Sequence, residues 1–202
     1  MAGVMRLTVL LLIAASLGFA DAPSQNWSGE YSPCDRHFDL LNHQHMDLGV
    51  RMATSNRMLA RQFARAMEFW QSVVDLDWHE VDSADCAIQL VDGTTDVFGS
   101  IDTCGCVSAR SQFPELPAFE GWIAFNPRVK LTEREMFLVS VHEIGHLLGL
   151  QHSSSGSSVM FYLGLDDPLA LDPADLYALA DRHRLRTGLL ERNVLKIVVP
   201  SN

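Results

Sequence analysis

Apolar residues recur with helical spacing in a stretch that starts shortly after residue 55. They return at every third or fourth position, which is the pattern of an α-helix with one buried face. Thr54 or Ser55 is expected to cap this helix, because hydroxyl side chains accept hydrogen bonds from the first free backbone N–H groups. The expected buried face consists of Leu59, Phe63, Ala66, Met67, Trp70 and Val73.

Shorter segments around this helix carry the signals of β-strands. Residues 76–81 alternate between apolar and polar side chains, a period of two that is typical of a strand with one buried face. The other segments predicted as strands are residues 45–52, 86–91 and 121–126. Residues 92–120 contain glycine, proline and two cysteines, and are predicted to form a long loop of the kind that is either functional or held by a disulfide.

Two more helices are indicated by their N-terminal signals. Thr132 and Glu135 form the pair of a capping box, and the helix that they start is expected to run through Leu148. Asp172 followed by Pro173 marks the start of a further helix. The chain shows no internal repeat, so one folded domain is the simplest interpretation.

The first 20 residues have the pattern of a secretory signal. Arg6 precedes an apolar run of nine residues, and small residues lead to a cleavage site after Ala20. The run is too short for a membrane span, which takes about twenty apolar residues, and no later segment is apolar enough to form one. The sequence therefore predicts a secreted, extracellular protein, or a periplasmic one if the source is a Gram-negative bacterium.

Charge and cysteine content refine this picture. The chain has 15 Lys and Arg against 25 acidic residues, a net charge of -10, which argues against binding to nucleic acid. In an oxidising compartment four cysteines favour two disulfides, with the connectivity left open. Cys104 and Cys106 are too close in sequence for an easy bridge, so each is expected to pair with Cys34 or Cys86.

The second predicted helix carries the residues that indicate chemistry. His142 and His146 are four positions apart, so they project from one face of the helix and can share a metal ion. Glu143 lies beside them, where it suits a general base acting on metal-bound water. Gly149 can end the helix in the left-handed conformation, so that His152 arrives as a third ligand. Three imidazoles leave one tetrahedral position of a zinc ion open, which is typical of a catalytic site.

The pattern from His142 to His152 resembles the extended signature of the metzincin metallopeptidases. Met160 is similar to the methionine of the Met-turn, which lies beneath the zinc ligands in that group. Its spacing of eight residues from His152, and Ser153 directly after that histidine, are similar to the matrixins, the matrix metalloproteinase group. The resemblance implies an α+β, zincin-like metzincin fold, with a twisted, mostly parallel sheet, an antiparallel edge strand, an active-site helix and a C-terminal helix.

The resemblance also implies how a substrate is bound. Leu138 and Phe161 would line an apolar specificity pocket, and Tyr162 would either stabilise the transition state or pack the pocket wall. The protein is expected to act as a monomer that holds one catalytic Zn²⁺. The edge strand that pairs with an extended protein or peptide substrate would consist of Trp122, Ile123, Ala124 and Phe125.

Several features differ from animal matrixins. Residues 92–120 contain no histidine, so the second, structural zinc site of those proteins is expected to be absent. Only residues 21–44 separate the signal from the first strand, so a cysteine-switch prodomain is not expected; Cys34 with its neighbour Asp35 could instead block the zinc, although a disulfide explains the cysteine better. Three aspartates of residues 92–120 could bind calcium or could simply be solvated turn residues: Asp92, Asp96 and Asp102.

The predicted organisation is a signal peptide over residues 1–20, an irregular segment or short propeptide over 21–44, a catalytic domain over 45–188 and a tail over 189–202. The predicted function is a secreted zinc-dependent endopeptidase with Glu143 as its general base. The alternative is a secreted, non-catalytic metal-binding or adhesion module on the same fold. The presence of Glu143 favours the enzyme, because a module that only binds metal needs no general base.

Overall fold

Five strands form one sheet in a computed structural model that describes residues 45–84, 87–98, 107–112, 121–161, 169–189 and 195–198. The strand order is β2-β1-β3-β5-β4, with parallel pairing throughout except for the antiparallel pair of β4 and β5. This arrangement confirms the α+β fold with a mostly parallel sheet and an antiparallel edge strand. The strands are β1 (Met46–Ala53), β2 (Leu76–Glu80), β3 (Ala87–Asp92), β4 (Ala109–Gln112) and β5 (Gly121–Phe125).

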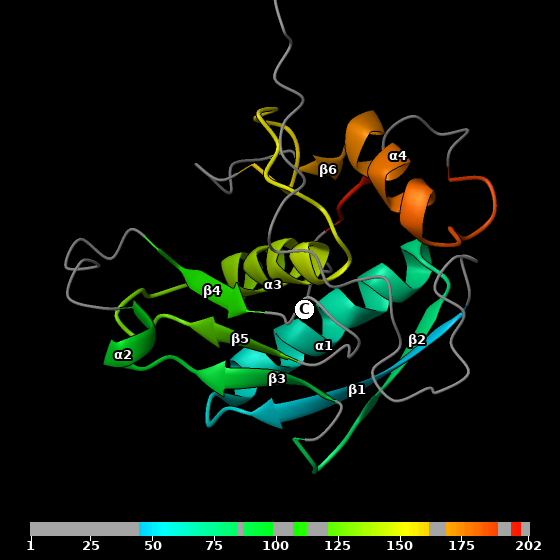
Figure 1. The fold of residues 1–202 in the computed structure, drawn as a ribbon. Helices are drawn as coiled ribbons and strands as arrows, with labels where there is room; N and C mark the ends of the chain where they lie inside the picture. Colours follow the sequence, from blue (N-terminus) through cyan, green and yellow to red (C-terminus); the bar gives the residue numbers. More distant parts are fainter. Residues whose placement is uncertain are drawn as a thin grey trace, which may run out of the picture.

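Two long helices, α1 (Arg57–Val73) and α3 (Glu133–Leu147), lie together over one face of this sheet (Figure 1). The short helix α2 (Thr95–Phe98) follows β3, and α4 (Pro173–Arg182) lies beyond α3. Two short strands, β6 (Ala170–Leu171) and β7 (Leu195–Lys196), form a separate antiparallel pair. In the part of the chain that the structure describes, no helix is long and apolar enough to cross a membrane.

The predicted buried face of α1 is confirmed, since all six of its residues are buried against α3 and the sheet. Trp70 is at the centre of this contact and is 0% exposed. Its indole N–H donates to the carbonyl of Val141 at 3.0 Å, so the ring contributes apolar packing and also satisfies its one polar group. Trp70 therefore fixes α1 against the segment of α3 that contains the histidines.

The N-cap of α1 is Asn56, so the prediction of Thr54 or Ser55 was wrong. The side-chain oxygen of Asn56 accepts from the backbone N–H groups of Met58 and Leu59, both at 3.1 Å. Thr54 and Ser55 instead donate to the two carboxylate oxygens of Asp92, at the end of β3. A sequence pattern could not rank three adjacent capping residues, because the choice depends on this contact with a distant strand.

Asp92 has a structural role that the sequence did not reveal. The hydroxyl of Thr54 and the backbone N–H and hydroxyl of Ser55 hydrogen-bond to its carboxylate, and they hold the pKa of Asp92 below its usual value. Both oxygens are therefore already used in joining the β1–α1 turn to β3. Asp102 and the side chain of Asp96 lie outside the described residues, so calcium binding stays an untested prediction.

The segment predicted as one long loop, residues 92–120, contains α2 and β4. This corrects the assignment of the edge strand as well. Trp122, Ile123, Ala124 and Phe125 belong to β5, which pairs with β3 on one side and β4 on the other. With both of its edges hydrogen-bonded, β5 has no free edge for a substrate, and β4 is the edge strand on that side of the sheet.

The predicted starts of the other two helices are confirmed. Thr132 and Glu135 form a reciprocal capping box at α3, and Asp172 and Asp175 form another at α4. Helix α3 ends at Leu147, and Gly149 adopts a φ of 91°, the left-handed conformation expected of it. These local signals were reliable because each depends on residues that are close in sequence.

Candidate metal centre

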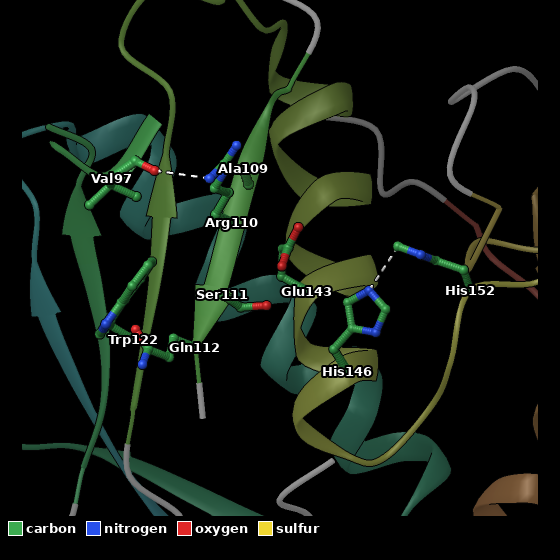
Figure 2. Close-up of a pocket in the computed structure, with 9 residues that line it drawn as sticks. All are labelled: Val97, Ala109, Arg110, Ser111, Gln112, Trp122, Glu143, His146 and His152. Carbon is green, nitrogen blue, oxygen red and sulfur yellow. Dashed lines mark hydrogen bonds between the residues drawn. The ribbon is translucent and has the colours of Figure 1, made fainter. Parts of the chain in front are cut away.

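Three histidine side chains converge where α3 meets the segment that follows it. His142 and His146 project from successive turns of α3, and His152 comes from the chain after the helix. The Nε2 atom of His146 lies 3.1 Å from Nε2 of His142 and 3.2 Å from Nε2 of His152. Figure 2 shows His146 and His152 facing one another. The structure thus brings together the three residues that the sequence singled out.

The opposite ring nitrogens of two of these histidines are held by backbone carbonyls. Nδ1 of His142 lies 2.7 Å from the carbonyl oxygen of Val159, and Nδ1 of His146 lies 2.8 Å from that of Leu150. A carbonyl can only accept, so each Nδ1 carries the proton and each Nε2 has a lone pair. Two lone pairs that face each other at 3.1 Å repel unless a cation lies between them. The donor set therefore fits a metal ion that prefers imidazole ligands.

The environment favours the neutral form of His146 and His152, which is the form that binds a metal. Burial, together with the electrostatic influence of His142 and His152, lowers the pKa of His146 to about 3, although the hydrogen bond to Leu150 acts in the opposite direction. Desolvation and His142 also lower the pKa of His152. Both rings are therefore neutral at neutral pH, and the bond from Nδ1–H of His146 to the Leu150 carbonyl leaves the Nε2 atom of His146 unprotonated.

Gly149 positions the carbonyl that holds His146. Its backbone N–H donates to the carbonyl of His146 at 3.0 Å, and the next N–H, that of Leu150, donates to the carbonyl of Gly145 at 2.9 Å. These two bonds form the Schellman ending of α3, which requires the positive φ of Gly149. The turn reverses the chain, so that the Leu150 carbonyl faces the His146 ring and His152 follows beside it.

Met160 lies beneath the helix segment that carries the histidines. It is 0% exposed, and its sulfur lies so near α3 that a Cβ added to Gly145 would be 2.6 Å from it. The backbone of Met160 is held on both sides, since its carbonyl accepts from the N–H of Ser153 and its N–H donates to the hydroxyl of Ser158. The absence of a side chain at Gly145 therefore lets Met160 pack directly under the site.

Gly145→Ala is expected to destabilise the protein by up to about 2 kcal/mol. Alanine is the better helix former by about 1 kcal/mol, but its methyl group would overlap Met160 and lie 3.3 Å from Trp70, both 0% exposed. Overpacking of such a core costs about 1–3 kcal/mol. Urea denaturation would measure the change, with Gly156→Ala as control because its Cβ would meet nothing closer than 4.0 Å. A Gly145→Ala protein at least as stable as the wild type would contradict this packing.

A short hydrogen-bond chain connects the same turn to α4. The hydroxyl of Ser158 accepts from the N–H of Met160 and donates to a carboxylate oxygen of Asp175 at 2.7 Å. Burial raises the pKa of Asp175, whereas its bonds to Ser158 and to the N–H of Asp172 lower it. Val159, whose carbonyl holds His142, lies between the two anchored residues. Asp175 thus both completes the capping box of α4 and fixes the backbone that orients His142.

Glu143 lies beside the histidines and is 8% exposed. Burial raises the pKa of its carboxyl group, while the charge of His142 and a hydrogen bond from Ser111 act in the opposite direction. In Figure 2 the side chains of Glu143 and Ser111 face one another across the space between α3 and β4. The carboxyl group is therefore held near the histidines by a residue of the edge strand.

A cavity of about 620 Å³ lies between β4 and α3 (Figure 2). It reaches Glu143 and two of the histidines at one wall and the edge strand at the other. Such a cavity could hold part of a ligand directly against the candidate base. The residues that line it are Val97, Ala109, Arg110, Ser111, Gln112, Trp122, Glu143, His146 and His152.

Other predicted site residues lie elsewhere or outside the described chain. Leu138 is 1% exposed in the core and does not line this cavity, and Phe161 is half-buried in a bridge with Ser153. Their role in a specificity pocket stays a prediction, as does that of Tyr162, which lies outside the described residues. The disulfide prediction is also untested, because the described ranges include none of Cys34, Cys86, Cys104 and Cys106.

The sequence did not reveal the residues that position the histidines and Glu143 through hydrogen bonds without binding metal themselves. The carbonyls of Val159 and Leu150 have no signal in the sequence, because every residue type has a carbonyl. Ser111 and Arg110 were overlooked because β4 has no apolar alternation to mark it as a strand. From the sequence, Asp175 is only an acidic residue near the start of a helix, because its bond to Ser158 requires the tertiary fold.

Comparison with known proteins agrees with this geometry. A sequence model of the family described as Matrixin matches residues 40–181. The chain is 31% identical over 105 residues to macrophage metalloelastase of Rattus norvegicus, an alignment that covers 49% of this chain and 22% of that protein. It is 28% identical over 138 residues to matrix metalloproteinase-16 of Mus musculus, covering 58% of this chain and 22% of that protein.

A plant protein is similar as well. The chain is 38% identical over 109 residues to metalloendoproteinase 1-MMP of Arabidopsis thaliana, an alignment that covers 49% of this chain and 30% of the plant protein. In all three comparisons the aligned part is less than a third of the relative's length. The similarity therefore concerns one region of these longer proteins.

Proposed function

Because this chain belongs to the matrixin family, a family of zinc-dependent metallopeptidases, we propose that it is an endopeptidase that cleaves peptide bonds with one Zn²⁺ held by His142, His146 and His152. The observation that carries the proposal is the convergence of three Nε2 atoms next to a buried glutamate. The hydrogen bonds of His142 and His146 to backbone carbonyls leave these atoms free to bind metal. Three nitrogen ligands leave a coordination position for the reaction.

Each residue of the site has a separate task. When bound, Zn²⁺ would act as a Lewis acid that polarises the scissile carbonyl and increases the acidity of water. Glu143 would accept the proton of the attacking water and then deliver it to the leaving amine. Ser111 would hold the carboxylate of Glu143 toward the cavity. Met160 would support the histidines from below, and Tyr162 is proposed to assist in stabilising the transition state.

The substrate is proposed to be a protein or peptide in extended conformation, bound along β4. The outer edge of β4 is not paired with any strand of the described chain, so its backbone groups can hydrogen-bond to an added strand. The cavity beside β4 connects this edge to Glu143. The proposed substrate strand therefore lies on β4 rather than on β5.

The same proposal includes export of the protein as a monomer. The support for export is the signal-like pattern of residues 1–20, an even number of cysteines and an acidic composition. Residues 45–188 are proposed as the catalytic domain, with Leu138 and Phe161 contributing to a pocket for an apolar side chain. Cleavage after Ala20 would be read from the N-terminal sequence of the protein recovered from the medium or the periplasm.

Metal removal tests the proposed function. The wild-type protein is expected to contain one zinc ion per chain by elemental analysis and to cleave casein or a peptide library. A chelator should abolish cleavage and added zinc should restore it, because the three histidines have no other means to polarise a carbonyl. Cleavage that survives complete zinc removal would contradict the proposal. Zinc binding without cleavage of any substrate would instead support the non-catalytic metal-binding module.

A further inference from the structure

Arg110 lines the proposed catalytic cavity, and the proposed mechanism does not use its positive charge. It lies on β4, is exposed, and lines the cavity beside Glu143. The next residue, Ser111, hydrogen-bonds to Glu143. Successive side chains of a strand point to opposite faces of the sheet, so the side chain of Arg110 points away from Glu143 and toward α2. Its backbone is only about 3.3 Å along β4 from that of Ser111, close to where a bound peptide would be cut.

The guanidinium group of Arg110 is held in place by α2. One of its terminal N–H groups donates to the carbonyl of Val97 at 3.1 Å, as Figure 2 shows. The guanidinium group also lies over the ring of Phe98, with 5.8 Å between its central carbon and the ring centroid. Such stacking fixes the plane of an arginine, and a fixed plane loses little entropy when it binds a carboxylate. Arg110 is therefore positioned before any ligand arrives.

No carboxylate of the described residues neutralises Arg110. The ion pairs found in this part of the chain involve other arginines and two histidines. Arg110 is the one arginine or lysine among the described residues that line the cavity. An exposed arginine that forms no ion pair within the described residues, at the edge where the substrate is proposed to bind, can pair with a ligand of opposite charge.

We infer that Arg110 selects peptide substrates that carry an aspartate or glutamate side chain opposite it. In an added strand the side chain facing Arg110 has its Cβ about 4.5–5.5 Å away on the same face. A carboxylate at that position can bind the guanidinium group with two parallel hydrogen bonds. This inference rests on the proposed function, and it names the substrate class of the same site as peptides with an acidic residue near the cleaved bond.

The size of the expected selectivity follows from exposure. Arg110 is at the cavity mouth, so solvent weakens its pairing, whereas a prearranged bidentate geometry strengthens it. We expect glutamate to be preferred over glutamine about 3- to 10-fold in kcat/KM at one position of the peptide. The preference should weaken with added salt, because the pair is only partly shielded from solvent.

The test uses quenched fluorescent peptides of one core sequence, in which Glu, Gln or Lys is placed in turn at each position around the cleaved bond. The wild-type enzyme should show one position with the Glu preference. In Arg110→Gln the ratio of Glu to Gln at that position should fall to about one, and in Arg110→Glu lysine should become the preferred residue. Arg61→Gln, an exposed arginine on α1 that does not line the cavity, should keep the wild-type ratio.

A binding measurement keeps this inference separate from the catalytic proposal. Fluorescence polarisation with the Glu143→Ala protein should show tighter binding of the Glu peptide than of the Gln peptide, and the difference should vanish in the Glu143→Ala, Arg110→Gln double variant. If the ratio of Glu to Gln were the same in the wild type and in Arg110→Gln, in cleavage or in binding, the role of Arg110 would be overturned. If that happened while cleavage still required zinc, the endopeptidase proposal would stand without the role of Arg110. If instead the wild-type protein cleaved no peptide but still bound the Glu peptide more tightly, the endopeptidase proposal would be refuted and the role of Arg110 would stand.

Discussion

Replacing Glu143 with glutamine is expected to lower kcat/KM for peptide cleavage about 10²- to 10⁴-fold, the contribution of a positioned general base. Glutamine has nearly the same shape as glutamate, so it fits the buried position, but its amide cannot accept the proton of the attacking water. The three Nε2 atoms that converge on the metal site are unchanged in this variant. The protein should therefore keep its zinc and lose its activity, and this separation identifies the role of Glu143.

The measurement combines steady-state kinetics with elemental analysis of the same samples. Glu68→Gln is a matched control, because Glu68 is an exposed glutamate on α1 whose loss leaves the cavity intact. Its kcat/KM should equal that of the wild type. If the Glu143→Gln enzyme kept wild-type activity, another group would have to be the base. If it lost zinc together with activity, Glu143 would be a part of the metal site.

Removing His146 should have the opposite signature, with zinc binding and activity lost together. His146 is the most central of the three histidines, since its Nε2 is close to those of both His142 and His152. Loss of an outer-shell partner weakens metal binding about 10- to 100-fold. Loss of a ligand itself should exceed that range. His146→Ala would also leave the carbonyl of Leu150 without the hydrogen bond that it now accepts.

Zinc titration monitored by thermal unfolding would measure this effect. A ligand that binds only the folded state raises the unfolding temperature with concentration, so zinc should stabilise the wild-type apoprotein and leave His146→Ala nearly unchanged. Circular dichroism would verify that the variant is folded. His79→Ala is the control, because His79 is exposed on β2 and bound to Asp47. An equal zinc response in His146→Ala and wild type would exclude His146 as a ligand.

Features specified by neighbouring residues could be predicted from the sequence. The spacing of His142 and His146, the glycine that ends their helix, and the capping box of Thr132 all act within a few residues. The buried face of α1 was predictable for a related reason, because its apolar residues repeat with the period of the helix itself. These features place the candidate base and the first two ligands without any knowledge of tertiary contacts.

Features that depend on contacts between distant segments were missed or misassigned. β4 has the sequence Ala-Arg-Ser-Gln, with no apolar alternation, and it is a strand because its backbone pairs with β5. Without β4, the next strand in the chain was taken for the edge. Asn56 caps α1 because Thr54 and Ser55 are bound to Asp92, which is separated from them by more than thirty residues. No local pattern contains that information.

The two carbonyl acceptors behind His142 and His146 have an evolutionary consequence. No single substitution can delete a backbone carbonyl, so replacing the side chain of Val159 or Leu150 does not remove the acceptor that fixes the tautomer of each ring. Drift in metal affinity must instead come through changes that move the main chain, such as a bulky residue at Gly149. Residues 154–157, which lie between the ligand His152 and the anchoring Ser158, can therefore diverge in composition while the tautomers of His142 and His146 stay the same, provided that the path of the chain is kept.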